Sequence, residues 1–132
     1  MKGVYVLIIS LTTGVNVKVG ALGKINFKKG TYVYVGSAHT NLQKRVERHL
    51  RKVKRRFWHI DYLLCNSNAK VLKVFYKISP KVEECKIAAQ LSQGGFPVEG
   101  FGSSDCDCKS HLFKVRGYDF LRESMHQLIT SQ

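Results

Sequence analysis

An unbroken apolar run at residues 4–9 limits the folds open to this chain more than any other feature of the sequence. The run is rich in β-branched residues and lacks the polar alternation of a strand with one solvated face. We therefore predict a central strand over residues 4–10, covered on both faces. The run is far shorter than the ~18 residues of a membrane span, and no secretory cleavage site follows it, so we expect a cytoplasmic protein.

The rest of the chain predicts a sheet with helices packed against it. Alternating patterns predict further strands over residues 15–20, 24–27, 31–36, 70–78 and 111–115. Apolar residues at helical spacing predict helices over residues 42–57, 80–93 and 118–129, with Asn41 as the N-cap of the first. Residues 58–64 are ambiguous between helix and loop. We expect one α+β domain over residues 1–132, with a small, mostly antiparallel sheet flanked by helices.

Positive charge is concentrated in one segment. The chain has 22 Lys+Arg against 9 Asp+Glu, for a formal net charge of +13. Residues 44–56 carry +7 of that charge, offset only by Glu47. Such clustering favours a polyanionic ligand over a charge that serves solubility alone. The sequence therefore predicts a nucleic-acid surface on the first helix and the segment after it.

Cysteine and histidine residues offer a second kind of site near the C-terminus. Cys106, Cys108 and His111 are soft metal ligands, and Cys65 or Cys85 would have to supply a fourth. Their spacing is not one of the common zinc-finger patterns. We therefore expect incidental thiols rather than structural zinc, and a zinc-stabilised protein-interaction domain stays open as a minor alternative.

Two tyrosines and the basic helix provide candidates for chemistry. Tyr5 begins the first strand and Tyr34 ends a later one, so neighbouring strands would bring their hydroxyls together. Arg45 and His49 lie four residues apart and therefore share one helix face, beside the apolar stripe. A guanidinium held there can bind a phosphate through two parallel hydrogen bonds.

Glu84 is the only acidic residue on the apolar face of its predicted helix, which it shares with Ile87, Ala88 and Leu91. A carboxylate on a core-facing stripe needs a metal or a hydrogen-bond network, because burying it unpaired costs several kcal/mol. A carboxylate favoured by the helix dipole is the simpler reading of the same position.

Together these features resemble the GIY-YIG nuclease domain. Residues 3–5 (GVY) resemble its first motif and residues 34–36 (YVG) its second, although an extra strand pair separates them here. The whole chain is similar to the stand-alone, largely archaeal type labelled Uri superfamily endonuclease. That closer resemblance rests on the stretches at residues 32–38, 58–63 and 100–106. The family's late asparagine has no clear equivalent, and Ser103, Ser104 or Asp105 occupies its region.

The resemblance implies a metal-dependent endonuclease that acts on DNA rather than RNA, in repair or processing. Glu84 would hold Mg²⁺ or Mn²⁺, and Arg45 would stabilise the phosphate. Tyr5, or Tyr34 as second choice, would orient or deprotonate the attacking water, with help from His49 and His59. Backbone phosphates would contact Lys44, Arg48, Arg51, Lys52, Arg55 and Arg56. The alternative is a binding module on the same scaffold that has lost catalysis.

Overall fold

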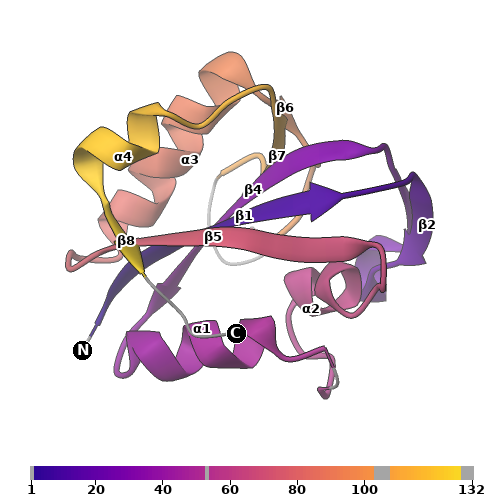
Figure 1. Ribbon diagram of the computed structural model, residues 1–132, viewed down its shortest axis with the longest axis horizontal. Coiled ribbons are helices and arrows are strands. Elements are labelled where there is room, and N and C mark those ends of the chain that lie inside the picture. Colours follow the sequence, from indigo (N-terminus) through magenta and orange to yellow (C-terminus); the bar gives the residue numbers. More distant parts are fainter. Residues whose placement is uncertain (1, 53, 103–107, 129–132) are drawn as a thin grey trace.

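A computed structural model describes residues 2–52, 54–102 and 108–128 of the chain. Within these ranges, six strands form one antiparallel sheet (Figure 1). Its order is β6 (Phe96–Pro97), β7 (Leu112–Val115), β4 (Gly30–Ala38), β1 (Gly3–Leu11), β5 (Ala69–Lys77) and β8 (His126–Leu128). Helices lie on both sides of this sheet. The predicted α+β class with an antiparallel sheet is therefore confirmed.

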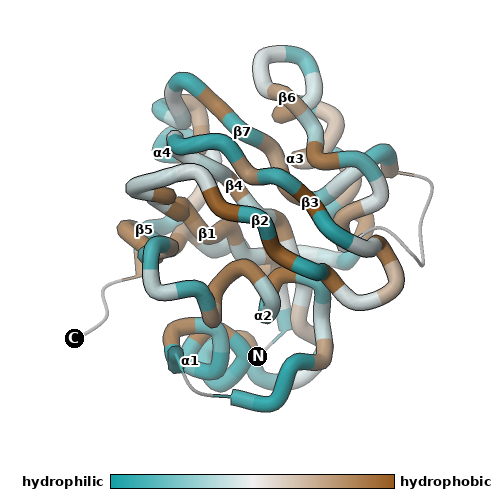
Figure 2. Tube along the Cα trace, turned by 90° about the vertical axis from the view of Figure 1, so that its right-hand side faces the viewer, coloured by the Kyte–Doolittle hydropathy of each residue, from teal (hydrophilic) through white to brown (hydrophobic). Residues whose placement is uncertain are grey.

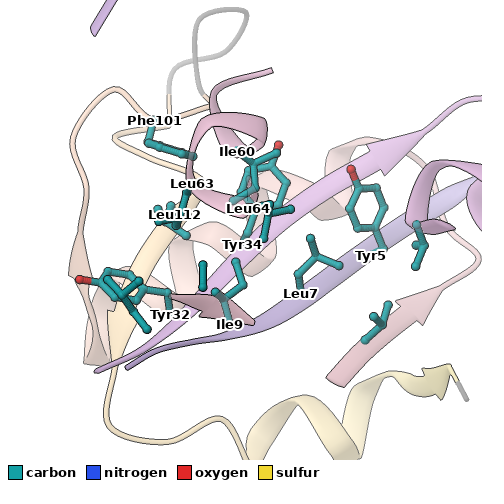
Figure 3. Close-up of a cluster of buried hydrophobic side chains, with 14 of the residues drawn as sticks. Tyr5, Leu7, Ile9, Tyr32, Tyr34, Ile60, Leu63, Leu64, Phe101 and Leu112 are labelled. Carbon is teal, nitrogen blue, oxygen red and sulfur yellow. The ribbon is translucent and has the colours of Figure 1, made fainter. Parts of the chain in front are cut away.

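The central strand of the sheet is β1, which pairs with β4 on one side and with β5 on the other. Side chains of residues 4–9 are all 0–1% exposed, so the predicted strand covered on both faces is confirmed. Alternate residues of β1 enter two separate cores. Tyr5, Leu7 and Ile9 belong to one core (Figure 3), and Val4, Val6 and Ile8 to the other.

The core that contains Tyr5 lies under α1 (Leu42–Leu50) and α2 (His59–Leu64), and we call this side of the sheet the α1–α2 face. The core that contains Val4 lies under α3 (Val82–Gly94) and α4 (Phe120–Ser124), on what we call the α3–α4 face. In Figure 1 the two pairs of helices lie on opposite sides of the sheet.

The extra strand pair is also confirmed. β2 (Val15–Lys18) and β3 (Lys24–Phe27) form a separate two-stranded sheet, joined by the short 3₁₀ helix η1 (Gly20–Leu22). Figure 2 shows this pair in front of the large sheet. Phe27 is buried in the core of the α1–α2 face, and Val15, Val17 and Ile25 pack against that core. The hairpin thus extends the core beyond the helices.

The first helix is shorter than predicted. Asn41 caps α1 as expected, since its side chain accepts a hydrogen bond from the Lys44 N–H. The helix ends at Leu50, however, rather than continuing to Phe57, which is 75% exposed. The Lys54 ammonium donates to the Arg48 and His49 carbonyls and so satisfies the helix end. A new helix, α2, then forms over the segment that was ambiguous from sequence.

The C-terminal prediction was wrong in part. α4 covers only Phe120–Ser124, and the chain then enters β8, which pairs with β5. Leu121 and Met125 are buried as predicted, whereas Leu128 faces the other core and Ile129 lies outside the described residues. Strand pairing with β5 therefore takes precedence over the helical pattern of this segment. None of the helices in the described ranges is long and apolar enough to cross a membrane.

Candidate active site

A pocket of about 360 Å³ lies beside the ends of β1 and β4. It brings together most of the catalytic and metal-binding residues predicted from sequence, namely Tyr5, Tyr34, Arg45, His59 and Glu84. Those residues come from five different elements: β1, β4, α1, α2 and α3. His49 is buried next to Tyr5, behind the pocket wall. The segments that carried the prediction are thus adjacent in the fold.

A hydrogen bond joins the first tyrosine to the basic helix. The Tyr5 hydroxyl lies 2.7 Å from His49 Nε2, and both side chains are buried. Tyr5 pairs with Gly36 across the β1–β4 ladder. A Cβ atom on Gly36 would lie 2.4 Å from both Cζ and Oη of Tyr5. The glycine is therefore required because the tyrosine ring crosses β4 at this position.

Burial sets the protonation of these groups. It lowers the pKa of His49 to about 3, and the nearby Lys54 ammonium acts in the same direction, so this imidazole is neutral. Burial raises the pKa of Tyr5, against the opposing effect of the Arg45 charge. Burial also raises the pKa of Tyr34 well above its usual value. Both phenols therefore carry their protons at neutral pH.

A buried carboxylate, Asp61, lies beside His49. Its Oδ1 lies 4.0 Å from His49 Nδ1, a ring nitrogen that has no hydrogen-bond partner. A negative charge on this side favours the proton on Nδ1, which leaves Nε2 to accept the Tyr5 O–H. We assign the tautomer on this basis. The result is a chain of three buried polar groups, Asp61, His49 and Tyr5.

Arg48 holds Asp61 in place. Its guanidinium donates to both carboxylate oxygens, at 2.9 and 3.0 Å, and the Phe57 and Trp58 N–H groups donate to Oδ2. Burial alone raises the pKa of Asp61, but these hydrogen bonds outweigh it and the pKa is lowered. Sequence reasoning missed Asp61. The sequence feature that could have identified it is an acidic residue inside an aromatic and apolar stretch, in a chain with few acidic residues.

Arg45 is oriented by two contacts. Its Nη1 donates to the Ser37 carbonyl at 3.0 Å, and its Cζ lies 4.3 Å from the centre of the Trp58 ring. Stacking on an aromatic ring and a backbone acceptor together restrict the long side chain. The guanidinium is therefore held at the pocket wall before any ligand arrives.

His59 faces the pocket from the start of α2. Its Nδ1 accepts a hydrogen bond of 2.8 Å from the Gly102 N–H, so the neutral ring carries its proton on Nε2. Burial lowers its pKa. Gly102 has a positive φ of 70° and lies against Tyr34 and His111, which explains a glycine in this loop. Residues 103–105, the predicted substitutes for the asparagine, lie outside the described residues.

Glu84 is buried, at 6% exposure, with Ile87, Ala88 and Leu91, as its position on the helix predicted. Its Oε2 lies 3.9 Å from Nδ1 of His111, which also lines the pocket. Among the described pocket-lining residues, Glu84 supplies the carboxylate. Mg²⁺ is usually bound through one or two carboxylates and substrate phosphate oxygens, so this donor set fits a magnesium ion.

The basic residues of segment 44–56 divide into two groups. Arg48 forms two hydrogen bonds with Asp61. Lys52 Nζ donates to three carbonyl groups, those of Leu64, Asn66 and Ala69. These two predicted phosphate contacts are thus engaged inside the protein. The other predicted contacts, Lys44, Arg51, Arg55 and Arg56, are exposed, as Lys52 also is despite its internal hydrogen bonds.

Two of the soft ligands named from the sequence, Cys108 and His111, lie beside Cys85, one of the two residues considered as a fourth ligand. Cys85, Cys108 and His111 lie together, whereas Cys65 follows α2 and is not part of this group. Cys106 lies outside the described residues. Sequence spacing alone could not choose between Cys65 and Cys85, because the choice depends on how α3 packs against the sheet.

Fold and pocket define an α+β protein that gathers tyrosine, arginine, histidine and glutamate side chains beside the central strands of an antiparallel sheet. The chain belongs to the family described as "Domain of unknown function DUF123", whose model matches residues 4–132. No curated protein and no solved structure matches the chain.

Proposed function

We propose that this protein is a metal-dependent endonuclease of the GIY-YIG type, close to the stand-alone Uri form, that hydrolyses phosphodiester bonds in DNA. The observation that carries the proposal is the 2.7 Å contact between the Tyr5 hydroxyl and His49 Nε2, beside a pocket that also contains Arg45 and Glu84. A phenol as proton acceptor, a guanidinium for the phosphate and a carboxylate for a metal together suit phosphodiester hydrolysis.

Tyr5 acts on the attacking water without forming a stable phenolate. The raised pKa of Tyr5 keeps its proton in place, so its oxygen first orients the water through a lone pair. As the water oxygen attacks phosphorus, its proton passes to Tyr5 Oη and the Tyr5 proton passes to His49 Nε2. Asp61 stabilises the positive charge on His49, since its Oδ1 lies 4.0 Å from Nδ1.

Arg45 and Glu84 act on the phosphate side of the reaction. Arg45, oriented by Ser37 and Trp58, donates to the non-bridging oxygens as negative charge develops there. Glu84 would hold the divalent ion, which when bound supplies charge stabilisation for the phosphate and the departing 3′-oxygen. His59, whose proton is on Nε2, is placed to donate a hydrogen bond into the pocket.

The exposed bases bind the flanking backbone. Lys44, Arg51, Arg55 and Arg56 supply charge on α1 and the segment after it. Each phosphate that they neutralise steepens the salt dependence of binding to duplex DNA by about 0.9 in log–log slope. Arg48 and Lys52 contribute through the fold rather than through direct contact, because both are engaged internally.

A cleavage assay tests the proposal. Labelled single-stranded, duplex and branched DNA and RNA are incubated with the protein in Mg²⁺ or Mn²⁺, with Glu84→Ala as the parallel variant. We expect metal-dependent cutting by the wild-type protein alone, with binding retained by the variant. Glu123→Ala is the matched control, because Glu123 lies on α4 and does not line the pocket.

Two results would contradict the proposal. Equal cutting by the wild type and Glu84→Ala would indicate a contaminating nuclease. Binding that weakens with salt but is never accompanied by cutting would favour the non-catalytic binding module on the same scaffold.

A further inference from the structure

Three potential metal ligands meet where α3 approaches the strand β7. Cys85 Sγ, Cys108 Sγ and a ring nitrogen of His111 all lie within 4.8 Å of one another, and the two sulfur atoms are 2.9 Å apart. Cys85 follows Glu84 on α3. Cys108 and His111 lie in the segment that leads into β7. Residues from two distant parts of the chain thus converge on one point.

We propose that Cys85, Cys108 and His111 bind a zinc ion, a site distinct from the divalent-metal site assigned to Glu84. Two thiolates and an imidazole are ligands that zinc prefers, and three protein ligands leave a fourth tetrahedral position for water or another donor. Mg²⁺, by contrast, selects oxygen ligands. The two positions therefore differ in ligand chemistry as well as in location.

The histidine favours a metal over a simple disulfide at this position. A disulfide would use only the two sulfur atoms, whereas the buried ring of His111 completes a ligand set beside them. The backbone of His111 is fixed on both sides, because its N–H donates to the Phe101 carbonyl and its carbonyl accepts from the Val35 N–H. The nitrogen ligand is consequently preorganised by these backbone hydrogen bonds to Phe101 and to β4.

A carboxylate also lies beside the site. Glu84 Oε2 lies 3.9 Å from His111 Nδ1, and metal-binding histidines commonly have a carboxylate at their second nitrogen. Zinc would therefore tie α3 to the β7 approach and fix His111 and Glu84 in the pocket wall. The role is structural and positioning, and the proposal stands independently of whether the pocket cleaves DNA.

Metal content tests the site directly. The full chain is purified under reducing conditions without chelator, and bound zinc is measured by mass spectrometry. We expect about one zinc ion per chain, the stoichiometry of a single site. In Cys85→Ser and in Cys108→Ser, the zinc bound per chain should fall about tenfold or more. Cys65→Ser changes a cysteine outside the cluster, so that variant should retain its zinc.

A second measurement covers variants that fail to fold. Cobalt replaces zinc in the wild-type protein, where thiolate ligation gives a sulfur-to-cobalt absorption band that oxygen ligands do not give. The band and stoichiometric zinc would support the site. Zinc-free wild-type protein without the band, a Cys85–Cys108 disulfide in metal-free protein, or equal zinc loss in Cys65→Ser would each overturn it.

Discussion

The two faces of the sheet are built from the same strands but differ in chemistry. On β1, Tyr5 enters the α1–α2 face, where it meets His49, whereas its neighbours Val4 and Val6 enter the α3–α4 face among apolar side chains. β4 divides in the same way, with Tyr34 on the first face and Val33 and Val35 on the second. Every second residue of these strands is thus available for a site, while the residues between them pack into the core that stabilises the fold.

Packing on the α3–α4 face stabilises the strands that carry the site on the α1–α2 face. An apolar core on the α3–α4 face, beside which α3 also buries Glu84, anchors β1 and β4. The α1–α2 face can therefore carry buried phenol, imidazole and carboxylate groups at a cost in stability. The hydrogen bond between Tyr5 and His49 and those from Arg48 to Asp61 offset part of that cost. If this division is correct, substitutions on the two faces should separate catalysis from stability.

Removing the hydroxyl on the α1–α2 face should have the largest effect. For Tyr5→Phe we expect the single-turnover cleavage rate to fall by about 10²–10⁴-fold, because the proton acceptor is lost. Tyr32→Phe is the control, since that buried hydroxyl donates to the Lys28 carbonyl and does not line the pocket. Equal rates in the two variants would contradict the role of Tyr5.

A truncation on the α3–α4 face should change stability alone. Ile8→Ala removes a fully buried side chain, so the free energy of unfolding should fall by about 2–5 kcal/mol in chemical denaturation. The folded variant should cleave at the wild-type rate. Ile78→Ala, at a position 55% exposed, should shift stability by no more than about 0.5 kcal/mol. A slower rate in folded Ile8→Ala would show that the faces are coupled.

Adding one methyl group should disturb both properties at once. In Gly36→Ala the new Cβ meets the Tyr5 ring at 2.4 Å, so we expect a loss of about 1–3 kcal/mol in stability and a slower cleavage rate. Gly117→Ala is the matched control, because a Cβ there has no atom within 4 Å. Unchanged stability in Gly36→Ala would mean that the Tyr5 ring can move aside freely.

The acid dependence of stability should also originate on the α1–α2 face. His49 has a pKa of about 3 when folded and 6.5 as its ordinary value, so the unfolded chain binds its proton first as pH falls. Stability should be full above pH 6.5 and decline towards pH 3, by at most about 1.4 kcal/mol per pH unit. Urea titrations should show a flatter decline for His49→Gln and the wild-type decline for His39→Gln, at an exposed position.

Local patterns predicted the fold where the chain's own periodicity decides the structure. β1 was found from its unbroken apolar run, and the buried side of α3 was found because its apolar residues recur at helix spacing. The end of α1 was missed because it depends on Lys54, which donates to the Arg48 and His49 carbonyls from outside the helix. β8 was missed because its state is decided by pairing with β5, some fifty residues earlier in the chain.

The site shows the same limit. Tyr5, Arg45 and Glu84 were identified one segment at a time, and the fold brings them to one pocket. Charge counting assigned Arg48 and Lys52 to a ligand, although their partners are a buried carboxylate and three backbone carbonyls. Such internal partners have no sequence signature, because they come from segments that become neighbours only after folding.

The central position of β1 also has a consequence for folding in the cell. β1 precedes both of its partners, and β5 ends 39 residues after β4, so at 5–20 residues per second the strand waits on the order of 2–8 s for its second neighbour. During synthesis its most apolar stretch therefore borders an open hydrogen-bonding edge. Nascent chains should be most prone to aggregate in that interval. Holdase chaperones that cover the unpaired edge should therefore raise the yield of folded protein more than substitutions that speed the folding of a helix.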